Sequence, residues 1–486
     1  MPEGLNQRRY ILPAFVVAAS LILGVVVAVG GPSIGVVLAL LLVTPLLVAQ
    51  RRVRVVFTAV LLVALVNGIP FVDLAALNLS GSFNYTDPIL LVLFGIGVYE
   101  LVRRPAALKG LVPRWLLVML LVFSLAWVVG VISGASQGTP ALKAILFGRD
   151  LLTVWLIVVV ALVFRDSTEV KILLCTIIVA SVIYSVAHGA QVGLGIDTSA
   201  ITHPKRITDA LGFARLYASM NLPSVLGFLS ALGFALWARS NRMRAWSAAA
   251  ALVIGLEQVL SLTRANYLAL SLALVIGCIA AFATGSVKWG VGRTGNALVG
   301  VSALAVGGYA LSFTSLARSS IWVSVQSRIT SAASDVSAAE GNVGYRLIVY
   351  AEMLRVLGNN WILGIGLQHP EYHWFAGLPD GTIRNSDVGV LSVLLPIGLL
   401  GLVPLLLIGV MACVESLRAM RTTDSLVRVV GWSCLCVCVV GLVSAPTLGY
   451  FSTLPGLMAI ACAVGLLCRV RSEGFLIDEM NGSHTT

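Results

Sequence analysis

The stretch from Tyr345 to Leu367 has an apolar helical pattern but carries Arg346, Glu352 and Arg355. A helix turns about 100° per residue, so the two arginines, nine residues apart, point about 180° apart. Glu352 lies three residues before Arg355 and can pair with it, whereas Arg346 has no acid three or four residues away. Arg346 is therefore the arginine that is available to bind a ligand. The alternative for Arg346 is an interfacial position at lipid headgroups.

The surrounding segment, residues 314–385, contains no lysine and five arginines: Arg318, Arg328, Arg346, Arg355 and Arg384. Guanidinium groups bind phosphates and carboxylates bidentately, so this pattern is typical of an oxyanion site. The chain as a whole has 27 arginines and 5 lysines, and part of the bias is therefore general.

Two carboxylates are candidates for chemistry. Glu257 lies within an apolar run, seven residues before Arg264, so the two share a face if the helix continues. An ionisable residue in such a run is a functional candidate, and a structural pair with Arg264 is an equal alternative. Asp387, three residues after Arg384, precedes another apolar run and is either a general base or a helix cap, and spacing alone favours the cap.

Metal-like patterns are weak. His369 and His373 are four residues apart around Glu371, but Pro370 discourages a regular helix through both, and no third ligand is evident. The eight cysteines all lie in or beside apolar runs without the spacing of a zinc site or a disulfide framework. We expect the cysteine-rich run at 434–438 to pack within a membrane helix.

These residues must be positioned by membrane helices. The 486-residue chain is 58% hydrophobic and only 11% charged, and many apolar runs reach the roughly 20 residues that cross a bilayer. The composition predicts an all-α polytopic membrane protein, because the strands of a β-barrel would alternate polar and apolar residues. The first run has no clear cleavage site and is expected to be a span and not a removed leader.

We predict 12–14 transmembrane helices, with fourteen candidate spans at 11–29, 33–50, 55–72, 88–102, 115–133, 149–164, 171–189, 216–237, 246–262, 266–284, 295–313, 386–411, 428–445 and 454–468. The chain then divides into spans over 1–313, a large, partly helical loop at 314–385, spans over 386–468 and a tail at 469–486. With the N-terminus inside, the net charge of +11 divides into +12 inside and −1 outside. The positive-inside rule therefore places both termini in the cytoplasm and the large loop outside.

This topology limits the function classes. The predicted cytoplasmic loops are short and no GxxxxGK[ST] motif is present, which argues against an ATP-driven pump. The basic loops face an anionic membrane surface, so the high pI does not require nucleic acid. No convincing internal repeat supports a transporter built from inverted halves.

Four segments occur in a family-specific order: KRITDALGFARLYASMNLPSVLGFL from 205, SLTRANYLAL from 261, GNVGYRLIVYAEMLRVLGNNWILGIGL from 341 and RNSDVGVLSVLLPIGLLGL from 384. Together they resemble the O-antigen ligase and polysaccharide polymerase (Wzy-like) superfamily of GT-C-like membrane glycosyltransferases. The match covers roughly residues 200–405, and each segment alone is weakly specific. Asp209 stands where glycine is usual, Tyr350 replaces a tryptophan, and Trp361 falls where proline is frequent.

The last segment favours a polymerase over a ligase. Ligases usually carry His-Asn there, many polymerases carry Asp, and this chain has Asp387 and Val388. The resemblance implies metal-independent inverting transfer of a glycan from an undecaprenyl-diphosphate carrier to a glycan or lipid-linked acceptor, at the outer face of the bacterial inner membrane. It implies no cofactor. A polysaccharide chain-length regulator is a candidate partner.

The resemblance also implies site residues. Arginines can stabilise the charge of a diphosphate leaving group, and an acceptor hydroxyl needs a base. The predicted catalytic residues are Asp387, Arg346 and Arg264. The predicted substrate-binding residues are Arg206, Arg328, Arg384, Asn221, His369, His373 and Glu257.

Three alternatives stay open. A ligase of the same superfamily uses the same donor. A lipid-linked oligosaccharide flippase or other transporter also suits fourteen spans, but a flippase requires a charged central cavity between two helical bundles, whereas this chain concentrates unpaired charge in the large loop and at the outer mouth. A non-enzymatic scaffold would not require arginines on several separate segments.

Overall fold

The computed structural model describes residues 50–67, 86–104, 107–198, 206–210, 213–217, 221–260, 264–286, 341–368, 389–446 and 450–472. The predicted spans at 11–29 and 295–313, the predicted tail after residue 472 and all but the last residue of the span at 33–50 lie outside these residues.

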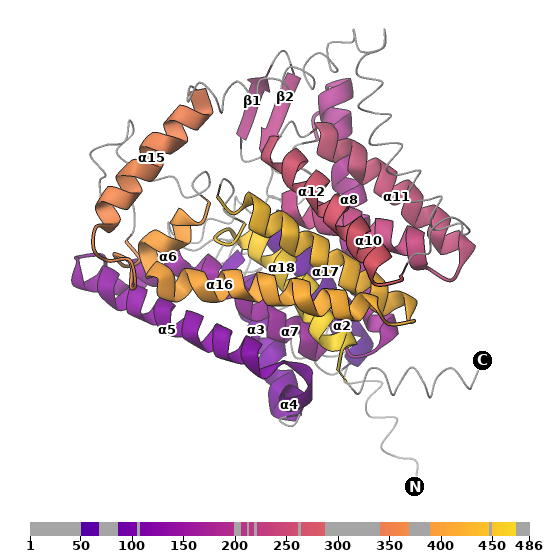
Figure 1. Ribbon diagram of the computed structural model, residues 1–486, viewed down its shortest axis with the longest axis horizontal. Helices are drawn as coiled ribbons and strands as arrows, with labels where there is room; N and C mark the ends of the chain where they lie inside the picture. Colours follow the sequence, from indigo (N-terminus) through magenta and orange to yellow (C-terminus); the bar gives the residue numbers. More distant parts are fainter. Residues whose placement is uncertain are drawn as a thin grey trace, which may run out of the picture.

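Every predicted span that falls on described residues coincides with a helix (Figure 1). The helices are α2 (Arg51–Asn67), α3 (Thr86–Arg103), α5 (Arg114–Ser136), α7 (Leu156–Val163), α8 (Ser167–Leu194), α10 (Asn221–Trp237), α11 (Asn241–Leu260), α12 (Arg264–Ala283), α16 (Leu391–Met420), α17 (Ser425–Ser444) and α18 (Leu454–Val470). Shorter elements are α4 (Ala107–Leu111), α6 (Ala141–Gly148) and the 3-10 helix η2 (Arg149–Trp155), and α15 (Gly341–Leu357) lies in the predicted large loop.

Helix length and hydropathy make the chain a multi-pass membrane protein. Among the described residues, five helical segments are long and apolar enough to cross a bilayer, and three apolar helices are shorter, at Leu222–Trp237, Leu268–Ala283 and Leu454–Val470. One of the five runs from Ala141 to Val163, so α6 extends toward the N-terminus a span that the sequence predicted from 149. Another, α16, continues to Met420, nine residues beyond its predicted end.

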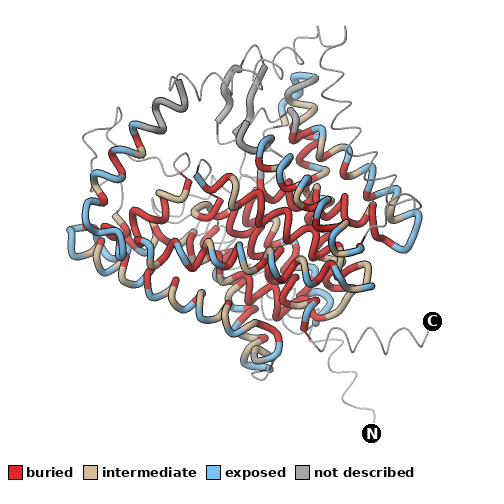
Figure 2. Tube along the Cα trace, in the orientation of Figure 1, coloured by how far each residue is buried: buried red, intermediate tan, exposed pale blue. Residues whose placement is uncertain are grey.

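Helix α17 lies at the centre of the bundle, packed against α10, α12, α16 and α18 (Figures 1 and 2). Of its most apolar window 83% is buried, against 33% for α5 at the edge. The exposed apolar side chains of α5 recur at three- and four-residue spacing, which suits a face toward lipid: Val118, Leu121, Leu125, Val128 and Ile132. All eight cysteines are free thiols, and Cys434, Cys436 and Cys438 are buried in α17, as expected from packing.

A two-stranded hairpin adds to the helical architecture. Strands β1 (Arg206–Ala210) and β2 (Phe213–Tyr217) pair in antiparallel register, with Arg206 opposite Tyr217. The sequence predicted a span from 216, but α10 starts only at Asn221, after the second strand. The hairpin connects the C-terminal side of α8 to the N-terminal side of α10 (Figure 1).

The helix ends gather in two groups, as the predicted alternation requires. One group, here the ion-pair end, comprises residues 50–54, 100–104, 164–169, 237–241, 284–286, 415–425 and 469–472. Arg51 pairs there with Glu169, and Arg239 with Asp424. The other group, here the loop end, comprises β1–β2, the first residues of α10 and α12, α15, residues 358–368 and residues 389–391 and 444–446.

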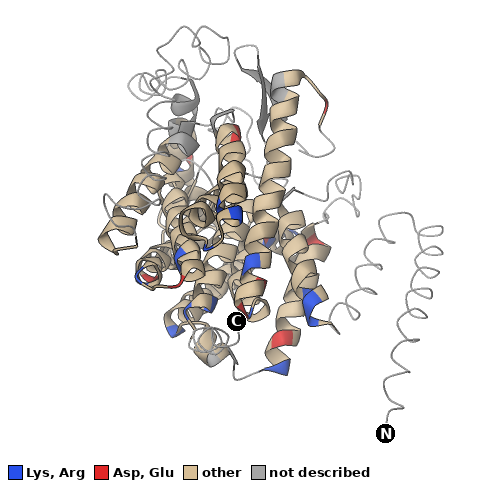
Figure 3. Ribbon diagram, turned by 90° about the vertical axis from the view of Figure 1, so that its right-hand side faces the viewer, with Lys and Arg blue, Asp and Glu red and all other residues tan. Residues whose placement is uncertain are grey.

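Contacts within the loop end join segments far apart in the chain. The backbone N–H of Val390 donates to the carbonyl of Ala445 at 2.7 Å. Most described lysines and arginines lie toward the opposite end, in the lower part of the view in Figure 3. Among the described helices the ends gather as the alternation predicts, and the topology of the whole chain and the side of the membrane that each group faces stay predictions.

Candidate functional site

Helix α15 has two unlike faces. Val349, Met353 and Leu357 recur at four-residue spacing and are buried. On the opposite face the Arg355 side chain is 67% exposed, and its Nε and Nη2 atoms lie 2.8 and 2.7 Å from the two carboxylate oxygens of Glu352. These contacts raise the pKa of Arg355 above its usual value. The pair predicted from the i, i+3 spacing is confirmed.

The packed face of α15 contacts the loop-end terminus of another helix. The Tyr350 hydroxyl donates to the carbonyl of Pro446, just beyond α17. Position 346 is one helical turn before Tyr350, so the helical register places it in line with Tyr350 along α15. The helical pattern predicted as far as residue 367 is wrong beyond Leu357, because Gly358 adopts a positive φ of 50° that ends the helix.

Residues 358–368, here the docking segment, enter a break in α16. Within α16, Gly398 has φ 62° and ψ −168°, and Pro396 has no N–H to donate. The break frees backbone groups that a membrane helix must satisfy elsewhere. The docking segment supplies their partners through four hydrogen bonds: Ile365 N to Leu395 O (2.8 Å), Gly366 N to Pro396 O (3.2 Å), Leu399 N to Trp361 O (2.8 Å) and Leu400 N to Ile362 O (3.0 Å).

The docking segment also contacts α5. The N–H of Leu367 donates to the carbonyl of Gly130 at 2.8 Å, and the Gln137 amide donates to the carbonyl of Ile365 at 2.8 Å. A Cβ at Gly134 would collide with the Leu367 carbonyl, so this close approach requires glycine. The C-terminal side of α15 is therefore fastened to both α5 and α16.

Four predicted site residues have a described backbone at the loop end. Arg346 lies in α15, Arg264 is the first residue of α12, Arg206 is the first residue of β1, and Asn221 is the first residue of α10. Their side chains lie outside the described part of the structure. Five further predicted site residues lie on segments outside the described residues: Asp387, Arg384, Arg328, His369 and His373.

Glu257 has a fully described environment, in α11. Its side chain is 2% exposed; one carboxylate oxygen lies 2.9 Å from Nδ1 of His188, and the other accepts a 2.6 Å hydrogen bond from the Gln258 amide. His188 belongs to α8, and its ring centroid lies 5.9 Å from that of Tyr184. The sequence prediction considered Arg264 as the partner and missed His188, although an ionisable residue inside an apolar run was a signal.

The described geometry thus places segments bearing Arg206, Arg264 and Arg346 at one end of the bundle and holds one of them, α15, by backbone bonds. Guanidinium groups on separate elements are suited to surround an oxyanion. No protein-family model and no curated protein matches the chain.

Proposed function

We propose that the chain is a polysaccharide polymerase-type glycosyltransferase, which transfers a glycan from an undecaprenyl-diphosphate carrier to an acceptor sugar hydroxyl. The observation that carries the proposal is the difference between the two faces of α15. The Arg355 side chain is exposed and engaged by Glu352, whereas the helical register puts position 346 in line with Val349 and Tyr350, on the other face of α15.

The chemistry of the donor explains why such a helix is held there. Departure of a lipid diphosphate develops negative charge, and preorganised cationic donors stabilise that charge most effectively when they are already in position. The backbone bonds of the docking segment and the Tyr350 hydroxyl fasten α15 and limit its motion. Arg264 and Arg206, which begin α12 and β1, would contribute from two other elements at the same end.

The acceptor hydroxyl needs a group that takes its proton. Asp387 is the candidate base, and the described chain resumes two residues later, at Gly389 in the loop end. In this proposal the loop end faces the outside of the bacterial inner membrane, and both termini lie in the cytoplasm. A lipid-linked donor accounts for a site at the membrane surface.

The proposal is tested with the purified full-length chain and a lipid-linked repeat unit, with polymer formation as the readout. Replacing Arg346 by alanine should lower the transfer rate about 100- to 1,000-fold, the usual effect of losing one oxyanion donor. Arg346→Lys keeps the charge but loses the planar fork, and we expect it to recover little activity. Arg355→Ala, on the same helix, is the matched control. Equal rates for the Arg346→Ala and Arg355→Ala variants would overturn the proposal.

A further inference from the structure

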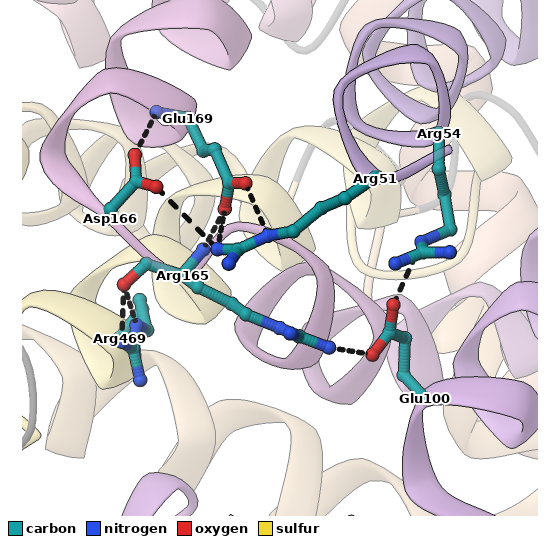
Figure 4. Close-up of polar contacts among 7 residues, drawn as sticks. All are labelled: Arg51, Arg54, Glu100, Arg165, Asp166, Glu169 and Arg469. Carbon is teal, nitrogen blue, oxygen red and sulfur yellow. Dashed lines mark hydrogen bonds and ion pairs between the residues drawn. The ribbon is translucent and has the colours of Figure 1, made fainter. Parts of the chain in front are cut away.

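The ion-pair end contains a cavity that the proposed transfer does not use. Its volume is about 170 Å³, and four arginines and two acids are among its lining residues: Arg51, Arg104, Arg165, Arg469, Glu100 and Asp166. These residues come from the ends of α2, α3 and α18 and from the turn between α7 and α8. Figure 4 shows five of the six, all but Arg104, as sticks.

The deepest arginine is held by a shared carboxylate. The guanidinium of Arg165 bonds one oxygen of Glu100, and Nε of Arg54 lies 2.8 Å from the other (Figure 4). The side chains of Arg54 and Glu100 are 1% exposed, and that of Arg165 is 9% exposed. Since one carboxylate serves two guanidinium groups, Arg165 is fixed in place beside the cavity.

Two further arginines are held by neighbouring groups. Arg51 pairs with Glu169, Nε to Oε1 at 2.8 Å, and more loosely with Asp166 at 3.5 Å. Arg469 donates from Nε to the backbone carbonyl of Arg165 at 2.7 Å. These contacts orient the guanidinium groups in advance of any ligand.

Arg104 completes the lining from the end of α3. It is exposed, and within the described part of the chain its side chain has no hydrogen bond or ion pair. Burial lowers the pKa of Arg165, Glu100 opposes that shift, and the positive charges of Arg104 and Arg51 lower the pKa further. Positive charges therefore repel one another in the cavity, and a bound anion would reduce that repulsion.

We propose that this cavity binds a phosphate-class oxyanion, supplied by the headgroup of an anionic phospholipid. The volume far exceeds the roughly 15 Å³ that one water needs, and guanidinium forks match the oxygens of a phosphodiester. Because the cavity lies at the ends of membrane helices, its arginines would reach the lipid headgroups, and Leu111 and Leu162 add apolar side chains to its lining. The proposal is independent of glycosyl transfer at the opposite end.

Titration calorimetry on the detergent-purified full-length chain tests the proposal. The probes are dihexanoyl-phosphatidylglycerol, dihexanoyl-phosphatidylcholine with the same acyl chains, and inorganic phosphate. We expect saturable binding of the anionic lipid and much weaker binding of the zwitterionic one. Saturable binding of inorganic phosphate alone would retain the oxyanion site but reject the lipid as its source.

Three substitutions localise the binding. Arg104→Gln removes one charge-assisted contact and should weaken the affinity for phosphatidylglycerol about tenfold or more. Arg103→Gln is the matched control, because Arg103 is the exposed neighbour on α3 and does not line the cavity. Asp166→Asn should tighten binding, because it removes a negative charge from the lining while asparagine still caps α8 at Glu169.

The outcomes are decisive in either direction. A selective loss in Arg104→Gln together with a gain in Asp166→Asn supports the site. Equal losses in Arg103→Gln and Arg104→Gln would indicate diffuse attraction between a basic surface and an anion, and would overturn the proposal. Absence of saturable binding by both phosphatidylglycerol and inorganic phosphate would overturn it as well.

Discussion

The two ends of the bundle hold their segments together by different means. At the ion-pair end, charged side chains from separate helices join one another, and Arg54 and Glu100 are almost completely buried. At the loop end, backbone groups of the docking segment fill the break in α16, and the ion pair described on α15 is exposed at Arg355. A segment that is held by its backbone keeps its charged side chains available for a ligand.

Because the two ends are held by different contacts, different substitutions should destabilise them. A buried ion pair needs every partner, because removal of one leaves a charge without compensation in a poorly solvated place. A docked backbone segment is insensitive to the loss of a surface charge but depends on the conformation that creates its partner groups. The predictions below test each kind of vulnerability at its own end.

The largest expected effect concerns catalysis at the loop end. Asp387→Asn should lower the polymer synthesis rate about 100- to 10,000-fold if Asp387 is the general base, because an amide does not take a proton from a hydroxyl. Asparagine caps helices about as well as aspartate, so the fold should be retained. Near-normal turnover of the purified variant would remove Asp387 from the mechanism and make His369, His373 and Glu371 the next candidates.

The second effect concerns stability at the ion-pair end. Glu100→Gln leaves the guanidinium groups of Arg54 and Arg165 without their shared charge and should lower the free energy of unfolding by about 3–5 kcal/mol. Denaturant titration of the purified chain measures the loss. Glu352→Gln removes the same charge at the loop end and should be far less destabilising, because its partner Arg355 is exposed. Equal losses would mean that the two ends do not differ in this way.

The third effect concerns the break in α16. Gly398→Ala places a side chain at a positive φ and a Cβ against the Ile362 carbonyl, which should cost at least about 1–3 kcal/mol in strain and release the docking segment. Limited proteolysis should then cut within residues 358–368. The ion-pair end should keep its stability.

A glycine-to-alanine control is available in α3. Gly95 lies within that helix, and a Cβ there would have no atom within 4 Å. Because alanine is the better helix former, Gly95→Ala should be neutral or slightly stabilising, by roughly 0.5–1 kcal/mol at most. If Gly95→Ala and Gly398→Ala expose the docking segment equally, the break in α16 is not what holds it.

Sequence analysis succeeded where the relevant partners are close in the chain or repeat regularly. Hydropathy located the helices, and the i, i+3 spacing identified the pair of Glu352 and Arg355. It missed the pair of His188 and Glu257, which are 69 residues apart. Glu100 within an apolar run was a visible signal, but its partner Arg165, 65 residues away, was not.

The break in α16 shows the same limit. Pro396 and Gly398 are visible in the sequence as helix-disrupting residues, but nothing local specifies which segment satisfies the freed backbone groups. The docking segment does so through main-chain atoms, which every residue possesses, so side-chain patterns carry little information about it. Local side-chain patterns also do not show which distant segments meet at the loop end, so identification of the candidate site depended on the family resemblance.

The smallest expected effect concerns Arg355, and it sharpens the contrast with the buried pair at Glu100. Its raised pKa keeps the Arg355 guanidinium charged well above neutral pH, because the contribution of such a pair is lost only as the pH rises through that pKa. Rising pH should therefore not weaken the pair, whereas added salt should, since the side chain is exposed.

Arg355→Ala should accordingly leave both the unfolding midpoint and the rate of polymer synthesis close to those of the unchanged chain. Water and salt already screen the charge that is removed, because the Arg355 side chain is 67% exposed. The informative comparison is with Arg346→Ala on the other face of the same helix. A large loss of transfer in Arg355→Ala would place the ligand on the exposed face of α15, and the packed face would then serve only to hold the helix.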